Sequence, residues 1–310
     1  MEDDIRAILE KQQYHIVGRH SGVKLCHWLG EKLLRSRPCY KETFYGIESH
    51  RCLQMSPAIN NCTQTCLFCW RYQGLLETAI PEEDEPEAIL LGAIEGQRKL
   101  ISGYKGDSRC TPEKWAEARE PTNVAISLSG EPTMYSRLGE FIDACHKRNM
   151  TTFLVTNGTM PEVLEKLDPL PRQLYVTVAA PSEEIYRKLC VPLQKDGWAR
   201  LNRTLELLPS LGTRTVIRHT LVQGWNMGRE KDYAKLDNIA DPLFIEPKGY
   251  VFVGYSRERM HNDNMPSHQS IIEFSEKLGA ETGRTILAEQ SSSRVVLLGT
   301  DKNKMNIRGQ

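Results

Sequence analysis

Residues 52–71 read CLQMSPAINNCTQTCLFCWR and join an apolar segment to three closely spaced cysteines. The first eight residues predict a buried strand. Cys62, Cys66 and Cys69 follow with the spacing C-x3-C-x2-C, on a loop that leads toward a helical segment. In βα barrels the residues that carry chemistry follow the carboxyl ends of the strands. This stretch therefore predicts a βα fold whose site begins with these cysteines.

The same order of strand and helix repeats along the chain. Five further apolar segments rich in β-branched residues predict buried strands at 123–130, 151–158, 173–180, 213–222 and 242–247. Segments with apolar residues at helical spacing lie at 85–101, 136–149, 160–167, 198–208, 230–240 and 270–280. Parallel strands joined by helical crossovers form an open sheet or a barrel, and six units fall short of the eight that close one. We predict an α/β fold, a partial (βα)6 TIM-like barrel.

The chain divides into three expected parts. Residues 1–55 form a cysteine-bearing N-terminal extension, residues 56–300 form the partial barrel, and residues 301–310 form a C-terminal tail. The N-terminus is acidic and helical, unlike a signal peptide. No apolar run approaches the roughly 18 residues that cross a bilayer. We therefore expect a cytoplasmic protein without a membrane partner.

Charge and composition leave the class of partner open. Forty basic and forty acidic residues give a formal net charge of zero, so a nucleic acid would need a local basic patch. A hydrophobic content of 40% argues against disorder. Nine cysteines, an odd count without a secretory signal, make a disulfide framework unexpected and favour metal ligands.

Three thiolates without a fourth ligand nearby indicate a particular kind of metal site. Soft thiolates select zinc or iron–sulfur clusters, and a structural zinc site needs four ligands. A [4Fe–4S] cluster normally takes four cysteines as well. With only Cys62, Cys66 and Cys69, one iron would stay open to a substrate. The alternative is three cysteines of a zinc ribbon, which the strand–loop placement disfavours.

The cysteine spacing, with Phe68 before the last cysteine, resembles the signature of the radical S-adenosylmethionine (SAM) enzymes. In that superfamily the open iron chelates SAM, which is cleaved to methionine and a 5′-deoxyadenosyl radical. The resemblance extends to residues at the ends of later strands, although Ser129 stands where glycine is more usual. It implies that SAM is bound by Ser129, Gly130, Glu131, Thr156, Asn157, Ser182, Arg218 and Gly224.

A second set of cysteines lies in the extension. Cys26, Cys39 and Cys52 are each thirteen residues from the next. They are either three unrelated buried cysteines or the ligands of a second cluster that is again one ligand short. We favour the second cluster, where a second substrate would bind by chelation.

Five segments, KLCHW, PCYKETFYGI, SHRCLQM, CLFCWR and SLSGEPTMY, resemble the tRNA 4-demethylwyosine synthase family in its archaeal, single-domain form. The resemblance implies a radical SAM carbon–carbon lyase of wybutosine biosynthesis. Such an enzyme condenses pyruvate with 1-methylguanosine, next to the anticodon of tRNA-Phe, to give 4-demethylwyosine. It implies SAM and two [4Fe–4S] clusters, the second of which holds pyruvate. Lys41 would form an imine with pyruvate, or it is an ordinary surface lysine.

The resemblance also implies partners. Without a flavodoxin-like domain, the electrons would come from an external ferredoxin- or flavodoxin-like donor, and we expect a monomer. Phosphates of the tRNA would meet basic residues, and bases would stack on aromatic residues. The candidates, each also explicable as a solvated charge or core aromatic, are Arg35, Arg37, Arg187, Lys188, Arg200, Arg203, Lys248, Arg257, Arg259, Trp70, Tyr135 and Tyr250.

Two other functions remain open on the sequence. One is a two-cluster radical SAM enzyme that acts on a small molecule. A tRNA-binding assay would distinguish it from a tRNA-modifying enzyme. The other is a non-catalytic iron–sulfur or zinc protein that binds RNA, which SAM cleavage by the reduced protein would exclude.

Overall fold

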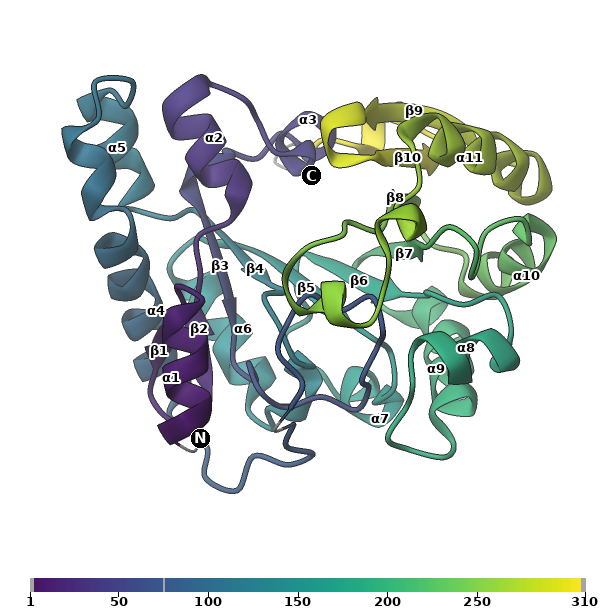
Figure 1. The fold of residues 1–310 in the computed structure, drawn as a ribbon, viewed down its shortest axis with the longest axis horizontal. Helices are drawn as coiled ribbons and strands as arrows, with labels where there is room; N and C mark the ends of the chain where they lie inside the picture. The colour runs from purple at the N-terminus through teal and green to yellow at the C-terminus, as the bar shows by residue number, and fades with distance from the viewer. Residues whose placement is uncertain (1–2, 75, 308–310) are drawn as a thin grey trace.

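The computed structural model describes residues 3–74 and 76–307, and its centre is one ten-stranded sheet (Figure 1). Six neighbouring strands run parallel and confirm the six predicted segments. They are β3 (Cys52–Ser56), β4 (Asn123–Ile126), β5 (Thr151–Thr156), β6 (Gln173–Thr177), β7 (Arg214–Leu221) and β8 (Phe244–Gly249). The sheet curves without closing, because its two outermost strands, β1 and β9, are at opposite ends of the strand order. The partial barrel is confirmed.

Four antiparallel strands extend the sheet and were not predicted. They are β1 (His15–Val17), β2 (Ser21–Val23), β9 (Thr285–Gln290) and β10 (Val295–Gly299). The first two have only three residues each, too few to show a period of two. Because β2 pairs with β3, the sheet runs across residue 55, the boundary expected for the extension.

Helices cover the outer face of the sheet. The six predicted helices are present as α4 (Pro86–Leu100), α6 (Leu138–Lys147), α7 (Pro161–Glu165), α9 (Gly197–Leu207), α10 (Glu230–Ala240) and α11 (His268–Thr282). The acidic N-terminal helix is α1 (Asp3–Lys11), and four further helices are α2 (His27–Arg35), α3 (Tyr40–Tyr45), α5 (Pro112–Ala118) and α8 (Glu183–Leu189). In the described residues no helix combines the length and the apolar character needed to cross a membrane.

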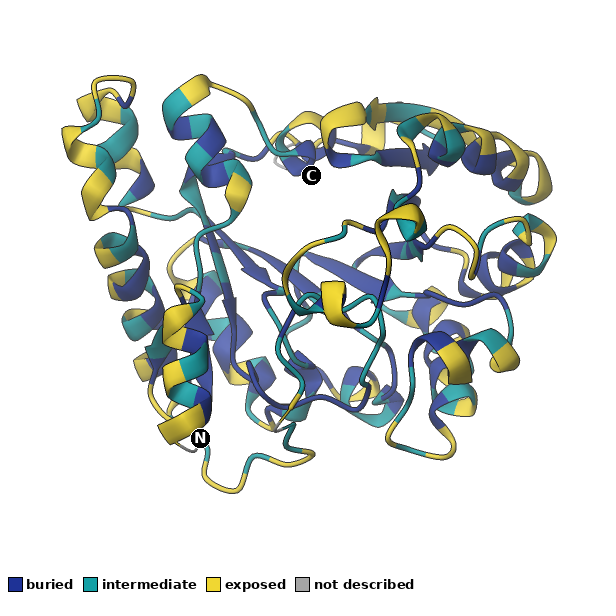
Figure 2. Ribbon diagram, in the orientation of Figure 1, coloured by how far each residue is buried: buried dark blue, intermediate teal, exposed yellow. Residues whose placement is uncertain are grey.

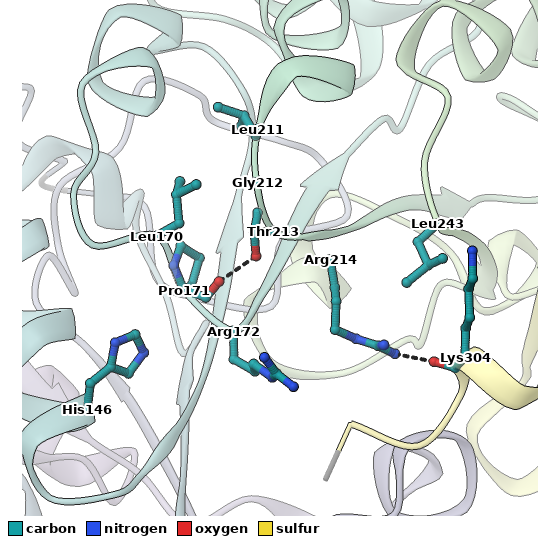
Figure 3. A pocket seen from close by; sticks show the side chains of 10 residues that line it. All are labelled: His146, Leu170, Pro171, Arg172, Leu211, Gly212, Thr213, Arg214, Leu243 and Lys304. Atoms are coloured by element: carbon teal, nitrogen blue, oxygen red, sulfur yellow. Dashed lines mark hydrogen bonds between the residues drawn. The ribbon is translucent and has the colours of Figure 1, made fainter. Parts of the chain in front are cut away.

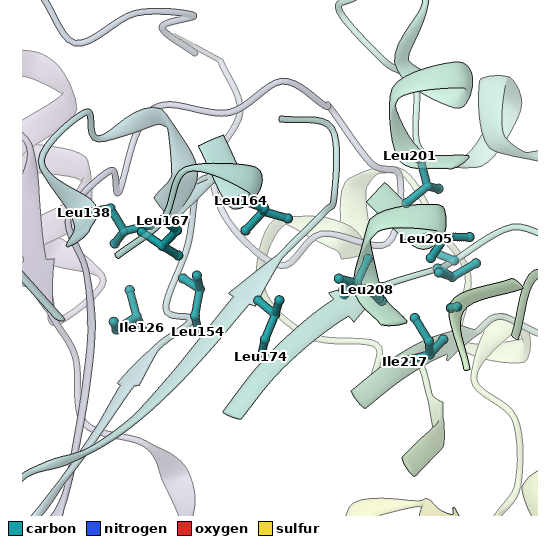
Figure 4. Packing of buried hydrophobic residues seen from close by; sticks show 14 of the residues in the cluster. Ile126, Leu138, Leu154, Leu164, Leu167, Leu174, Leu201, Leu205, Leu208 and Ile217 are labelled. Atoms are coloured by element: carbon teal, nitrogen blue, oxygen red, sulfur yellow. The ribbon is translucent and has the colours of Figure 1, made fainter. Parts of the chain in front are cut away.

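The main core lies between the strands and these helices. Figure 4 shows Ile126, Leu154, Leu174 and Ile217 of successive parallel strands facing leucines of the covering helices. Each fully buried leucine or isoleucine contributes about 1.5–3 kcal/mol to folding. Figure 2, coloured by burial, shows that the strands are buried and that the outer faces of α5 and α11 are exposed.

A second core closes the inside of the barrel at one end. Tyr45 of α3 packs with Phe244 of β8 inside the sheet, with ring centroids 5.9 Å apart. The tail joins this core, because Met305 and Ile307 are buried in it and the Ile307 amide donates to the Tyr45 carbonyl at 3.1 Å. The last three residues of the expected tail, 308–310, and the first two of the expected extension lie outside the described residues. Helix α3 and the tail therefore form a floor beneath the parallel strands.

Candidate active site

The first cysteine trio, Cys62, Cys66 and Cys69, lies on the loop after β3, as predicted. Backbone hydrogen bonds fix this loop, because the Leu67 amide donates to Leu189 at the end of α8 and the Thr65 amide donates to Val191. The Cys69 amide donates to the Cys66 carbonyl at 3.1 Å, which makes a tight turn between the last two thiols. Burial raises the pKa of the Cys62 thiol to about 12. Metal loading must therefore displace protons from buried thiols.

Arg71 lies among these thiols, and the sequence analysis gave it no role. Its side chain is 3% exposed, and Nη2 donates to the Gln64 carbonyl at 3.1 Å. Burial lowers the pKa of Arg71, but the three cysteines, Cys69 first, raise it above its ordinary value. Nη1 is buried and has no hydrogen-bond partner within the described part of the chain. A permanent positive charge beside three thiolates favours an anionic ligand set.

The ends of β4 and β5 hold the cysteine loop in place. Glu131 donates its amide to the Asn61 carbonyl at 2.7 Å, and its buried carboxylate accepts hydrogen bonds from Thr156 Oγ1 and the Asn157 amide. Asn157 Nδ2 lies 3.8 Å from the Cys62 sulfur and 2.9 Å from Thr63 Oγ1. Strand-end residues that sequence analysis assigned to SAM are therefore brought together around the first trio.

Gly130 shows how closely these segments approach. Its φ is +70°, and a Cβ built on it would lie 1.7 Å from the Ala58 carbonyl oxygen. Ser129, the departure from the usual glycine, donates its hydroxyl to the Ile59 carbonyl at 3.0 Å. Serine is accommodated at 129, whereas glycine is required at 130.

The other predicted SAM residues lie at later strand ends. Ser182 precedes α8, and its Oγ is buried without a hydrogen-bond partner among the residues described. Gly224, with φ of +80°, lies in the turn after β7. Arg218 has a different environment, because Nη2 donates to Tyr40 of α3 at 2.7 Å and to Glu246 of β8 at 3.0 Å. Those contacts belong to the side of the site that faces the N-terminal extension.

The second trio assembles on that side. Cys26 and Cys39 precede the first residues of α2 and α3, and Cys52 begins β3. Burial first, and the charge of Cys26 as well, raise the pKa of Cys39 and that of Cys52, each to about 12. Three thiols spaced thirteen residues apart in the sequence are therefore close enough to interact.

Lys41 lies near Cys39 and Cys52 of the second trio, whose charges act on its amine. It is 7% exposed, and its Nζ lies 4.4 Å from the ring centre of Phe153 and 4.8 Å from that of Tyr175. Burial, and then the charge of Arg218, lowers the pKa of Lys41. The alternative of a surface lysine is wrong.

Among the described residues, no three Cys, His, Asp or Glu side chains form a group placed to hold a single metal ion.

One hollow on the molecule does not belong to this site. Figure 3 shows it at the amino ends of β6 and β7, with a volume of about 580 Å³, lined by His146, Arg172, Arg214 and Lys304 among others. Arg214 donates to the Lys304 carbonyl at 2.6 Å, so the hollow borders the floor. It contains no residue of either trio.

Comparison with known proteins identifies the family. Residues 56–236 match the radical SAM superfamily, and residues 239–300 match a family described as wyosine base formation. The S-adenosyl-L-methionine-dependent tRNA 4-demethylwyosine synthase of Pyrococcus abyssi is 51% identical over 307 residues, which are 97% of this chain and 90% of that protein. The chain belongs to the tRNA 4-demethylwyosine synthase family.

Solved structures of the synthase family share the whole fold. One, described as TYW1 with a lysine-pyruvate adduct bound, has a TM-score of 0.89 and 38% identity and covers 98% of this chain and 97% of its own. Another, described as archaeal TYW1, has a TM-score of 0.80 and 34% identity. It covers 99% of this chain and 98% of its own. The predicted family is confirmed.

Membership of this synthase family and of the radical SAM superfamily implies SAM and a [4Fe–4S] cluster. The residues present fit both groups. The first trio offers three thiolates, and Arg71 Nη1 and Ser182 Oγ are buried polar atoms without partners in the described chain. The second cluster remains a prediction.

One further expectation needs correction. Tyr135 and Tyr250 are 0% and 3% exposed, so they are core aromatics and cannot stack on bases. Cys190, to which the sequence analysis gave no role, lies beside the first trio, and its hydrogen bond is the main cause that raises the pKa of Cys66. The proposed phosphate contacts remain predictions. Arg35, Arg187, Lys188, Arg200 and Arg203 pair with carboxylates, and Arg259 donates to carbonyls of the cysteine loop.

Proposed function

We propose that the chain is a tRNA 4-demethylwyosine synthase, which condenses pyruvate with 1-methylguanosine next to the anticodon of tRNA-Phe. Family membership supports this, as does the solved relative described with a lysine-pyruvate adduct. The observation that carries the proposal is the position of Lys41, a buried lysine beside Cys39 and Cys52 of the second trio.

We assign the first trio to the [4Fe–4S] cluster and the neighbouring strand ends to SAM. When bound, these groups supply a 5′-deoxyadenosyl radical. Asn157 and Glu131 hold the cysteine loop, and Gly130 lets the backbone of β4 approach it. The unpartnered Ser182 hydroxyl is available to a polar group of SAM. The full proposed set is Ser129, Gly130, Glu131, Thr156, Asn157, Ser182 and Gly224.

Lys41 is assigned to pyruvate, and Cys26, Cys39 and Cys52 to a second [4Fe–4S] cluster. The neutral amine adds to the ketone carbon, and loss of one water leaves a carbon–nitrogen double bond. The rings of Phe153 and Tyr175 border the amine and exclude bulk water from it. The imine nitrogen can then be exchanged for the exocyclic nitrogen of the guanine.

The test is product formation with purified, reconstituted protein under oxygen-free conditions. SAM, pyruvate, a reductant and tRNA-Phe carrying 1-methylguanosine are supplied, and the digested nucleosides are analysed by mass spectrometry. Wild type and the exposed-lysine control Lys277→Ala should form 4-demethylwyosine, whereas Lys41→Ala should form none and still release 5′-deoxyadenosine. Normal product from Lys41→Ala would remove this lysine from the reaction.

A groove beside the cysteine loop is the proposed place for the anticodon loop. It is lined by Lys11, Lys24, Trp70, Tyr255 and Arg257 and has a volume of about 650 Å³. The Tyr255 amide donates to the Trp70 carbonyl at 2.9 Å, so the groove wall is attached to the cysteine loop. Cations and exposed ring surface together suit phosphates and unstacked bases.

The remaining partners are proposals as well. An external ferredoxin- or flavodoxin-like protein would supply electrons to a monomeric enzyme in the cytoplasm. A small-molecule substrate in place of tRNA is the second candidate. Retention of tRNA-Phe at low salt, and its release at higher salt, would distinguish the two.

A further inference from the structure

Three basic side chains from different elements meet inside the barrel, above the floor. Arg218 of β7 and Lys41 of α3 both lie against the ring of Tyr175, with Cζ 4.5 Å and Nζ 4.8 Å from its centre. Lys248 of β8 lies with Nζ 4.4 Å from the ring centre of Tyr40, and Arg218 Nη2 donates to the hydroxyl of the same tyrosine. The shared rings place the three basic groups in one chamber.

One carboxylate faces these cations, and it is committed to Arg218. Glu246 is completely buried and accepts hydrogen bonds from Arg218 Nε at 3.3 Å, from Arg218 Nη2 at 3.0 Å and from Tyr45. Within residues 3–74 and 76–307, Lys41 and Lys248 form no ion pair with a carboxylate, and the hydrogen bonds of Arg218 use only Nε and Nη2. The other anionic groups near the two lysines are thiols of the second trio, Cys39 and Cys52 at Lys41 and Cys39 and Cys26 at Lys248. Those thiols are assigned to the cluster, so Arg218 is the cation of this chamber with a donor edge left for a substrate anion.

Glu246 and Tyr40 fix the orientation of the Arg218 side chain. They hold Nε and Nη2, which leaves the Nη1 edge of a planar guanidinium available. A 2-oxo acid carries its carboxylate on the carbon next to the ketone. A cation close to the amine that condenses with the ketone can therefore bind that carboxylate, and Arg218 lies against the same tyrosine ring as Lys41.

We propose that Arg218 binds the carboxylate of the 2-oxo acid whose ketone condenses with Lys41, and that Lys248 is the second cation at that carboxylate. This rests on the proposed role of Lys41. It moves Arg218 from the SAM site to the pyruvate site. Arg218 thereby becomes the residue that selects a charged 2-oxo acid over a neutral ketone of the same size.

The test compares pyruvate with methyl pyruvate, which has the ketone but no charge. Reconstituted protein is incubated with each compound, and borohydride reduces the carbon–nitrogen double bond to a stable secondary amine on Lys41. Peptide mass spectrometry gives the concentration for half-maximal trapping. Wild type and the surface control Arg148→Gln should trap pyruvate at least tenfold more readily than the ester.

Arg218→Gln should lose most of that preference, while iron content and SAM cleavage stay at the wild-type level. This variant leaves the buried Glu246 without its ion-pair partner. The double variant Arg218→Gln/Glu246→Gln removes that charge as well, and it should lose the preference for pyruvate to the same extent. Lys248→Met should reduce the preference in part, and Arg218→Lys should retain more of it than glutamine does.

Three results would overturn the inference. Equal weakening of pyruvate and its ester in both glutamine variants would make Arg218 merely structural. An unchanged preference for pyruvate over its ester, together with weakened SAM binding, would show that Arg218 belongs to the SAM site. Absence of trapping at Lys41 in wild type would overturn the proposed role of Lys41, and this inference with it, whatever Arg218 does.

Discussion

The phenol of Tyr45 donates a hydrogen bond to Glu246 across 2.5 Å, although 201 positions separate the two residues in the sequence. Glu246 in turn holds Arg218, so α3 supports the charged chamber from below. The floor of the barrel and the site above it are one connected structure.

Replacing Tyr45 by phenylalanine should destabilise the protein by about 1.5–3 kcal/mol, because a buried charged acceptor loses a donor. Urea unfolding measures the change. Tyr233→Phe is the matched control, since the Tyr233 hydroxyl is buried without a partner in the described residues. An equal effect of both substitutions would show that the bond to Glu246 contributes little.

Single cysteine substitutions should distinguish the cluster ligands of the first trio from the neighbouring Cys190. Cys62→Ala should lose about four irons per chain after reconstitution, which is one [4Fe–4S] cluster. Cys190→Ala should retain them, because Cys190 is a buried neighbour of Cys66 rather than a ligand. Iron and sulfide analysis measures the cluster content of both variants. Loss of iron from Cys190→Ala would show that Cys190 is a fourth ligand, and that the cluster has no open iron.

Glu42 should contribute to the loss of stability in acid. Burial raises its pKa, but hydrogen bonds from Lys32 and Ser49 lower it more, and the pKa lies below the ordinary 4.5. A lowered folded-state pKa gives stability that is present above about pH 4.5 and lost as the pH falls through the folded value.

The urea midpoint of wild type should therefore decline below pH 4.5 more steeply than that of Glu42→Gln. Ser49 also accepts a hydrogen bond from the Cys39 amide at 3.3 Å, so this acid sensitivity lies beside the second trio. Parallel pH profiles for the two proteins would contradict the assignment.

Neutralising the groove beside the cysteine loop should weaken tRNA binding. Lys24 places its Nζ 5.0 Å from the ring centre of Trp70, and the ring of Trp70 stacks on that of Tyr14 at 6.0 Å. Lys24→Gln should reduce affinity for tRNA-Phe several-fold and flatten its salt dependence by about one phosphate contact. Fluorescence anisotropy across a salt series measures both, and Lys277→Gln on α11 should behave like wild type.

Much of the architecture was predictable because its signals are local. Each parallel strand is a short β-branched run, and the three cysteines after β3 occupy eight successive positions. The edge strands β1 and β2 have no such signal, since three residues cannot display a period.

Contacts between distant segments were not predictable in the same way. Arg218 meets Glu246 because β7 and β8 pair in a register that places these two residues side by side, and no pattern in either segment indicates it. Cys190 reaches Cys66 through the end of α8. Tyr135 and Trp70 both follow strand ends, yet only packing makes the first a core residue and leaves the second accessible to a base.

The floor gives residues near the end of the described chain a part in the assembly of the site. Every cysteine and every chamber cation has been synthesised once the ribosome has passed residue 248. Yet the amide of Ile307, nearly sixty residues later, is what bonds to the Tyr45 carbonyl, and Met305 is buried beside it. A prematurely terminated polypeptide would thus contain all the chemical groups and lack the support beneath them.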